Sequence, residues 1–322
     1  MTYDDEGTQH TGRALPGLPA PPPPGASALP PGTYDGQVVL VTGGGTGLGK
    51  AIAAEFARLG ADLVIASRKE DRLKAARDQL AALGGKVTAV VCDIRDPERI
   101  VELFDAAEAA HGLPGVLVNN AAANFPVPAE EMSPRAWRSV VDITLTGTFL
   151  VTREFARRHL AAGAPGSVID VGASYAWTGG PGFAHSAAAK AGVKSLVESL
   201  AVEWGPYGIQ VNGLVPGLMP HEDMTADIRA NLDRASGDSG DSGDGHGGSL
   251  GRARDQDDRQ PALRVGAPRE LGWAATFLAS PYARFITGHT LVVDGANWQR
   301  RGLVSPAVVT VREQMGRGPF TG

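Results

Sequence analysis

The sequence predicts an α/β fold: one doubly wound sheet of seven parallel strands with helices on both faces. Two observations carry this prediction. Short apolar runs that suit buried strands alternate along the chain with amphipathic stretches that suit helices, and a glycine-rich turn joins the first run to the first helix. Parallel strands joined by right-handed crossovers then give the doubly wound architecture of the Rossmann fold.

Each predicted strand is short and apolar on both faces, as a buried parallel sheet requires. In chain order the strands are QVVLVTG (37–43), DLVIAS (62–67), KVTAVVCD (86–93), GVLVNNA (115–121), GSVIDVGA (166–173), IQVNGLVPG (209–217) and HTLVVDG (289–295). Helical patterns lie between them, such as GLGKAIAAEFARLG (47–60) and KEDRLKAARDQLAALG (69–84). This regular alternation predicts a single domain.

The chain has 322 residues, of which 43% are hydrophobic, and this is ample for one large α/β domain. We expect the domain to span 35–300. Residues 1–34 contain ALPGLPAPPPPGASALPPG and are predicted to be a disordered Pro-rich tail, with a ligand for a partner domain as the alternative. Residues 235–260 are predicted to be a disordered Gly/Ser/Asp insertion, and 301–322 a C-terminal extension.

Composition excludes several classes of function. The net charge of −5 is spread over mixed acidic and basic residues, so no nucleic-acid surface is expected. No apolar run approaches the roughly 18 residues of a membrane span, and the acidic start MTYDDEGTQH resembles no signal or transit peptide. The single Cys92 suits a reducing compartment and a buried position. We therefore expect a cytoplasmic protein, and no metal site, because the His residues show no metal-ligand spacing.

A dinucleotide site is predicted where the first strand meets the first helix. Gly43, Gly47 and Gly49 form a TGxxxGxG pattern between these two elements, with Thr46 and Leu48 in the same turn. Glycine lets the backbone turn tightly and approach a pyrophosphate, and the N-terminus of the following helix favours the phosphate charge. A glycine-rich turn without a ligand is the alternative.

The end of the second strand favours NADP(H) as the cofactor. Enzymes that prefer NAD usually carry a carboxylate there, which accepts a hydrogen bond from the ribose 2′-hydroxyl. This chain has Ser67, Arg68 and Lys69 instead. A guanidinium pairs well with a 2′-phosphate, although a solvated charge pair that opens the next helix is the alternative. Asp93 ends the third predicted strand and is expected near the adenine. Asn119 and Asn120 end the fourth predicted strand and are expected to hold the loops around the cofactor.

These motifs together resemble the short-chain dehydrogenase/reductase family. TGGGTGLG, NNA and the Pro216–Gly217 pair occur in the family's order, and the similarity covers about residues 36–297. The resemblance implies a nicotinamide cofactor held by the glycine turn, by Asn120, by Pro216–Gly217 and by Lys190. Related enzymes usually form tetramers, so a homo-oligomer, tetramer or dimer, is expected.

The family's usual proton-handling residues are altered. Typical members have a Tyr four residues before the Lys and a Ser thirteen before that Tyr, and an Asn that supports the Lys through water. Counting back from Lys190 gives Ser186 and Ala173, and the Asn position falls at Thr146.

One branch, the 2,4-dienoyl-CoA reductases, resembles the layout of this chain. These enzymes keep a Ser four residues before the Lys and place their working Tyr fifteen before it, where this chain has Tyr175, and their Asn–Phe pair after NNA is matched by Asn124 and Phe125. The branch usually has Gly in place of Ala123 and Asn in place of Thr146.

The resemblance implies a role for each residue of the site. Tyr175 and Asn124 would stabilise charge on the thioester oxygen, Lys190 would hold the nicotinamide ribose and favour ionisation of a nearby phenol, and Ser186 would orient Lys190. Contacts to the acyl-CoA would come from Arg95, Phe125 and Ser133.

Three functions stay open at this point. The first is an NADPH-dependent reductase of 2,4-dienoyl-CoA in fatty acid degradation. The second is a carbonyl reductase or alcohol dehydrogenase that acts on 3-oxoacyl or other ketone substrates, and the third is a catalytically degenerate sensor that binds NADP. Tyr175 as a packed loop residue and Asn124 as a turn cap are the corresponding structural alternatives, and His185 is expected at the surface or behind the site.

Overall fold

The computed structural model describes residues 2–3, 9–10, 17–221, 260–299 and 310–317. Its centre is a seven-stranded sheet in the order β5-β4-β3-β6-β7-β8-β9, and every neighbouring pair in it is parallel. The strands are β3 (Val38–Thr42), β4 (Asp62–Ser67), β5 (Val87–Val91), β6 (Val116–Asn119), β7 (Gly166–Val171), β8 (Ile209–Pro216) and β9 (Thr290–Val293). The predicted fold is confirmed: a Rossmann-type sheet built from the seven predicted apolar runs.

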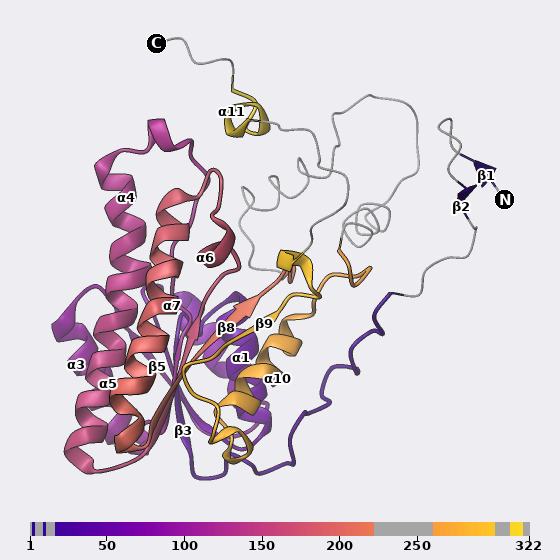
Figure 1. Ribbon diagram of the computed structural model, residues 1–322. Coiled ribbons are helices and arrows are strands. Elements are labelled where there is room, and N and C mark those ends of the chain that lie inside the picture. Colours follow the sequence, from indigo (N-terminus) through magenta and orange to yellow (C-terminus); the bar gives the residue numbers. More distant parts are fainter. Residues whose placement is uncertain (1, 4–8, 11–16, 222–259, 300–309, 318–322) are drawn as a thin grey trace.

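Helices cover both faces of the sheet (Figure 1). One layer contains α1 (Gly47–Arg58), α2 (Glu70–Ala81) and α10 (Pro268–Leu278), and the other contains α3 (Pro97–His111), α5 (Thr148–Ala162) and α7 (Ala184–Trp204). Alternate residues of each strand serve the two layers, because side chains of a strand point to opposite faces. On β3, Val39 and Val41 pack under the first layer, and Val38 and Leu40 under the second.

Shorter elements lie around this core. They are α4 (Pro134–Val141), a π-helical turn over Asp142–Gly147, α6 (Tyr175–Thr178), α11 (Val311–Gln314), 3-10 turns at Ala129–Glu131, Gly205–Tyr207, Pro281–Ala283 and Asn297–Gln299, and an antiparallel pair of β1 (Thr2–Tyr3) and β2 (Gln9–His10). The π-helical turn joins α4 to α5, and α6 precedes α7, so both lie next to the elements that carry the predicted site.

The predicted disorder of residues 1–34 differs from the structure over its described second half. Residues 17–34 run beside α1 and α10 (Figure 1), and Trp273 Nε1 on α10 donates to the Ala26 carbonyl at 3.1 Å. Tyr34 is 2% exposed, packs edge-on against Phe56 of α1, and donates its hydroxyl to the Thr276 carbonyl at 2.6 Å. Proline removes donors from the tail itself, yet its carbonyls still accept from α10, and this interaction gives the segment a fixed place.

The other predicted segments are described only in part. The predicted insertion lies outside the described residues except for Gln260. Within the predicted C-terminal extension, α11 and the residues after it contact the 3-10 turn at Ala129–Glu131. Arg312 pairs with Glu130 at 3.1 Å and with Glu131 at 2.9 Å, and Arg317 also pairs with Glu131.

Candidate active site

A cavity of about 530 Å³ lies at the carboxyl ends of β3, β4, β5 and β6, where ligands bind in open parallel sheets. Most of the predicted cofactor residues line it: Gly43, Thr46, Gly47, Leu48, Ser67, Arg68, Lys69, Asp93 and Asn120. Gly49 lies directly behind it, in the first turn of α1. Nine of the predicted cofactor residues therefore line one cavity.

The glycine turn leaves no room for side chains. Gly43 and Gly47 have positive φ angles of 66° and 54°, a backbone conformation that glycine adopts without strain. A Cβ atom on Gly49 would lie 2.3 Å from Asn120 Nδ2 and 2.4 Å from the Gly43 carbonyl oxygen. Asn120 in turn donates to the carbonyls of Thr42 and Gly43 at 3.2 and 3.3 Å, so it fixes the turn as expected. A bare backbone beside a helix N-terminus fits a dinucleotide pyrophosphate.

The β4 side of the cavity is positively charged. Arg68 and Lys69 follow β4, and Arg72 on the first turn of α2 lies beside them, a residue that sequence reasoning missed. No hydrogen bond or salt bridge engages these three side chains within the described part of the chain. Across the cavity, the Arg95 guanidinium hydrogen-bonds to Asp93 and thereby lowers the pKa of that carboxyl. The lining thus fits an anionic group next to Ser67.

The three predicted acyl-CoA contacts have different surroundings. The Arg95 guanidinium forms an ion pair with Asp93, with its Nε at 2.9 and 3.1 Å from the two carboxylate oxygens. Ser133 caps α4, and its hydroxyl accepts from the Ala136 amide at 3.1 Å. Phe125 follows Asn124 in the chain and packs against His185, so it lies beside the catalytic candidates.

The catalytic candidates meet at the amino-terminal end of α7. The hydroxyl oxygens of Tyr175, on α6, and Ser186, on α7, lie 3.0 Å apart, and Asn124 Nδ2 donates to the same Tyr175 oxygen at 3.5 Å. Three residues far apart in the sequence are therefore in contact. Burial raises the pKa of the Tyr175 phenol, although the Ser186 hydrogen bond opposes it, so the phenol keeps its proton at neutral pH.

Ser186 does not orient Lys190 as expected. The Ser186 hydroxyl contacts Tyr175, whereas the Lys190 ammonium donates to the Val171 carbonyl at the end of β7. Both residues lie on one face of α7, but a serine side chain is too short to follow the lysine towards the sheet and reaches α6 instead. Ser186 is thus a neighbour of Tyr175.

The π-helical turn positions Asn124 through a residue that sequence reasoning missed. Thr144 is fully buried, and its hydroxyl accepts from the Ala123 amide at 3.2 Å and donates to the Ala123 carbonyl at 3.4 Å. Thr146, at which the resemblance placed the supporting Asn of typical family members, is exposed. Such π turns often occur at functional sites, but no sequence signal distinguishes them from an ordinary helix.

His185 is fully buried behind the site. Of the two expected positions, the surface or behind the site, the surface is therefore wrong. Its Nδ1 accepts from the Ser186 amide at 2.8 Å, and its ring packs edge-on against Phe125, with centroids 4.7 Å apart. The contact joins the loop that carries Asn124 to the helix that carries Ser186.

A buried polar cluster lies beneath Lys190. Asn119 Nδ2 donates to Thr152 at 2.7 Å and to Asp170 at 2.8 Å. Burial raises the pKa of Asp170 to about 7 and lowers that of Lys190 to about 8, while the opposite charge of each partly offsets the effect on the other. Asn119 therefore supports the site from below and does not hold the cofactor loop.

The family model described as short chain dehydrogenase matches residues 37–233. The chain belongs to the short chain dehydrogenase family. A Caenorhabditis elegans relative named "probable 2,4-dienoyl-CoA reductase [(3E)-enoyl-CoA-producing]" is 37% identical over 266 residues, 82% of this chain and 81% of the relative. A Bacillus subtilis relative named "probable 2,4-dienoyl-CoA reductase [(2E)-enoyl-CoA-producing]" is 34% identical over 263 residues, 81% of this chain and 96% of the relative. A crystal structure of a short chain dehydrogenase from Bacillus anthracis has a TM-score of 0.70 and 34% identity, and covers 81% of this chain and 96% of its own.

This short chain dehydrogenase is therefore an oxidoreductase with a Rossmann fold, which implies a nicotinamide dinucleotide cofactor, and it resembles the dienoyl-CoA reductase branch. The described helices include none long and apolar enough to cross a membrane. In the described ranges, no group of His, Cys, Asp and Glu side chains is arranged to hold a metal ion.

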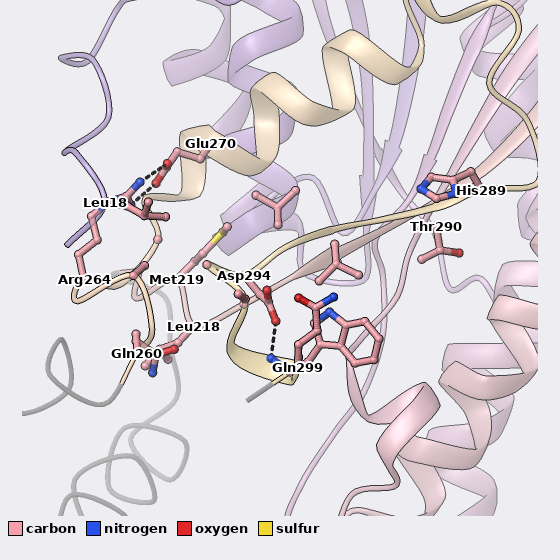
Figure 2. A pocket seen from close by; sticks show the side chains of 18 residues that line it. Leu18, Leu218, Met219, Gln260, Arg264, Glu270, His289, Thr290, Asp294 and Gln299 are labelled. Carbon is pink, nitrogen blue, oxygen red and sulfur yellow. Dashed lines mark hydrogen bonds and ion pairs between the residues drawn. The ribbon is translucent and has the colours of Figure 1, made fainter. Parts of the chain in front are cut away.

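The short chain dehydrogenase has a second cavity, of about 470 Å³, beside the predicted Pro216–Gly217 motif (Figure 2). The Gly217 amide donates to the Val293 carbonyl at 2.9 Å, and a Cβ atom there would lie 2.6 Å from Asp294. Glycine is therefore required where the chain leaves β8 and crosses the end of β9. Trp298 lines this cavity and stacks on Trp177 of α6, with ring centroids 5.2 Å apart.

Proposed function

We propose that the protein is an NADPH-dependent reductase of 2,4-dienoyl-CoA thioesters. The observation that carries the proposal is the contact of Tyr175 with Ser186 and Asn124. Through this contact the Tyr175 phenol lies next to residue 186, the position at which typical family members have their catalytic Tyr. The relatives named as probable 2,4-dienoyl-CoA reductases support the same substrate class.

The cofactor would lie in the 530 Å³ cavity, with its pyrophosphate against the glycine turn and its 2′-phosphate near Arg68, Lys69 and Arg72. Bound there, NADPH supplies the hydride. Lys190, whose ammonium is fixed at the end of β7, would hold the nicotinamide ribose. The absence of a carboxylate directly after β4 supports NADPH over NADH, because Ser67 ends that strand.

Tyr175 and Asn124 would stabilise the charge that develops on the thioester oxygen. Addition of hydride to the far end of the diene moves negative charge to this oxygen, and preorganised donors lower the energy of that state. Asn124 has an amide donor and Tyr175 a protonated hydroxyl, 3.5 Å apart, so both can donate to one oxygen that lies beside them, within hydrogen-bond distance of each. The raised pKa of Tyr175 suits a donor that keeps its proton until the product is formed.

The wider biological assignments follow from this substrate class. We propose a role in fatty acid degradation, a cytoplasmic location and a homo-oligomer, tetramer or dimer. Exposed apolar residues on α5 and α7 support association, since Phe149 is 38% exposed and Val202 80% exposed.

A substrate screen tests the proposal. NADPH oxidation would be followed with a 2,4-dienoyl-CoA, a 3-oxoacyl-CoA and a simple ketone, with NADH in parallel. We expect turnover of the dienoyl-CoA with NADPH alone and loss of that turnover in Tyr175→Phe. Faster turnover of 3-oxoacyl-CoA or ketones would identify a carbonyl reductase, and NADPH binding without turnover of any of them a sensor. Chromatography of the product would distinguish a 2E from a 3E enoyl-CoA, the two products that the relatives' names specify.

A further inference from the structure

A buried carboxylate that the proposed chemistry does not use lies at the end of β7, next to the backbone that holds Lys190. Asp170 is 1% exposed, and its Oδ1 accepts from Asn119 Nδ2 at 2.8 Å. Its Oδ2 is buried with no hydrogen-bond partner among the described residues. Because an unpaired buried carboxylate oxygen is costly, this atom needs a compensating charge or donor close by.

Lys190 is the side chain in position to supply that charge. It is 7% exposed and donates to the carbonyl of Val171, the residue that follows Asp170. Asp170 and Lys190 also line one small cavity of about 10 Å³, roughly the volume that admits a single water, together with Thr290, a residue labelled in Figure 2. Both residues therefore border one space that is too small for bulk solvent.

Lys194 is the one other charged side chain that lines this space among the described residues. On β6 and α5 the facing groups are the neutral Asn119 and Thr152, and on β9 it is Thr290. On α7, Lys194 lines the same cavity but is paired with Glu198 on the exposed side. The remaining titratable neighbours, the phenol of Tyr175 and the ring of His185, are paired with Ser186.

We propose that Asp170 is a positioning residue for Lys190: its carboxylate is the buried counter-charge that keeps the ammonium protonated and directed at the end of β7. The inference rests on the proposed function in two readouts: NADPH affinity depends on the proposed cofactor site, and kcat depends on the proposed substrate.

The charge of Asp170 has a definite effect on the titration of Lys190. Burial lowers the pKa of Lys190, and the Asp170 carboxylate opposes this shift. Removing the negative charge therefore lets the pKa of Lys190 fall further, so that the ammonium loses its proton at a lower pH. Any property that depends on the charge of Lys190 will then decline at lower pH.

The test compares Asp170→Asn, which keeps the shape and removes the charge, with Thr152→Val. The control removes the Thr152 hydroxyl, which also accepts a hydrogen bond from the Asn119 amide, and changes no charge. NADPH affinity would be measured from pH 6 to 10 without substrate, and kcat with dienoyl-CoA over the same range. We expect the alkaline decline of both profiles to move down by about one pH unit in Asp170→Asn and to stay in place in Thr152→Val. Superimposable profiles of wild type and Asp170→Asn would overturn the proposal.

The two arms keep this inference separate from the substrate assignment. If the protein does not reduce dienoyl-CoA, the pH dependence of NADPH affinity still reports the charge of Lys190. Should Asp170→Asn not fold, the side-chain NMR signal of Lys190 in the wild type, assigned by its loss in Lys190→Met, decides the matter. A two-step titration, with one step from Asp170, supports the coupling, and a single step refutes it.

Discussion

Replacing Tyr175 by Phe removes one hydroxyl oxygen and tests the centre of the proposed site. In the structure this oxygen is 3.0 Å from Ser186 Oγ and 3.5 Å from Asn124 Nδ2, and the phenol is protonated. A general acid or oxyanion donor typically contributes about 10²–10⁴ in rate, which is about 3–5 kcal/mol of transition-state stabilisation. We expect kcat to fall within this range, and not further, because Asn124 still donates.

The assay is steady-state oxidation of NADPH with a dienoyl-CoA substrate, with NADPH affinity measured separately by fluorescence. Tyr175→Phe should leave NADPH affinity unchanged, since the phenol contacts neither the glycine turn nor Lys190. Ser186→Ala is the matched control, because it removes the hydroxyl on the other side of the same hydrogen bond. We expect it to cost no more than about tenfold in kcat, as it loses a neutral hydrogen bond and no group that reaches the substrate.

The opposite ranking would refute this reasoning. If Ser186→Ala abolished turnover and Tyr175→Phe were almost as active as the wild type, Ser186 would be the proton-handling residue, and a rewired carbonyl reductase would be the better assignment. Lys190→Ala provides a third comparison, since it should weaken NADPH binding as well as kcat.

Three further outcomes follow from the described contacts. Arg68→Asp should weaken NADPH binding by a few kcal/mol, because it removes a charge-assisted phosphate contact worth roughly 1.5–3 kcal/mol and adds repulsion. Equal affinities of the wild type for NADH and NADPH in calorimetry would contradict the expected contact of Arg68 with the 2′-phosphate. Tyr34→Phe should lower the free energy of unfolding in urea by about 1–2 kcal/mol, because it removes the hydrogen bond from Tyr34 to the Thr276 carbonyl in the last turn of α10. The control Tyr207→Phe, at a 62% exposed position, should change the free energy of unfolding by less than about 0.5 kcal/mol. Deleting residues 236–251, which lie outside the described residues, should leave the melting temperature nearly unchanged, because Gly, Ser and Asp dominate this stretch of the sequence, and a large drop in calorimetry would contradict this expectation.

Much of the fold was predictable because its signals are local. Each strand is an apolar run bounded by polar or glycine residues. The turn after β3 needs positive φ angles, and the glycines at positions 43 and 47 indicate this in the sequence. Tyr175 and Lys190, on α6 and α7, are fifteen residues apart in one short stretch of the chain, so the resemblance in their spacing can be read directly from the sequence. These features depend on neighbours in the chain, which a sequence displays directly.

The rest of the site depends on contacts between distant segments. Nothing in the sequence around Asp170 indicates that it is fully buried near Lys190, because the preceding strand pattern fits an apolar or a polar residue there. Asn119 donates to Asp170, whereas its neighbour Asn120 donates to the glycine turn. The two side chains point in opposite directions because side chains alternate at the end of β6. The ion pair of Arg95 with Asp93 is likewise a contact that the sequence does not reveal, and the contact of Arg95 with acyl-CoA stays a prediction.

The proline-rich segment changes where this protein begins as a folding unit. The family match starts at residue 37, yet Tyr34 is already in the core and Leu29 packs against it. Upstream of these, the Ala26 carbonyl shares the Trp273 indole with the buried carboxylate of Glu55, and the Leu18 amide donates to the Ala262 carbonyl at 2.8 Å. A fragment trimmed to the family boundary would remove the outer cover of α10 and expose Trp273 and the carboxylate of Glu55 to solvent. The segment that reads as a spacer in the sequence therefore covers the outer side of the first helical layer.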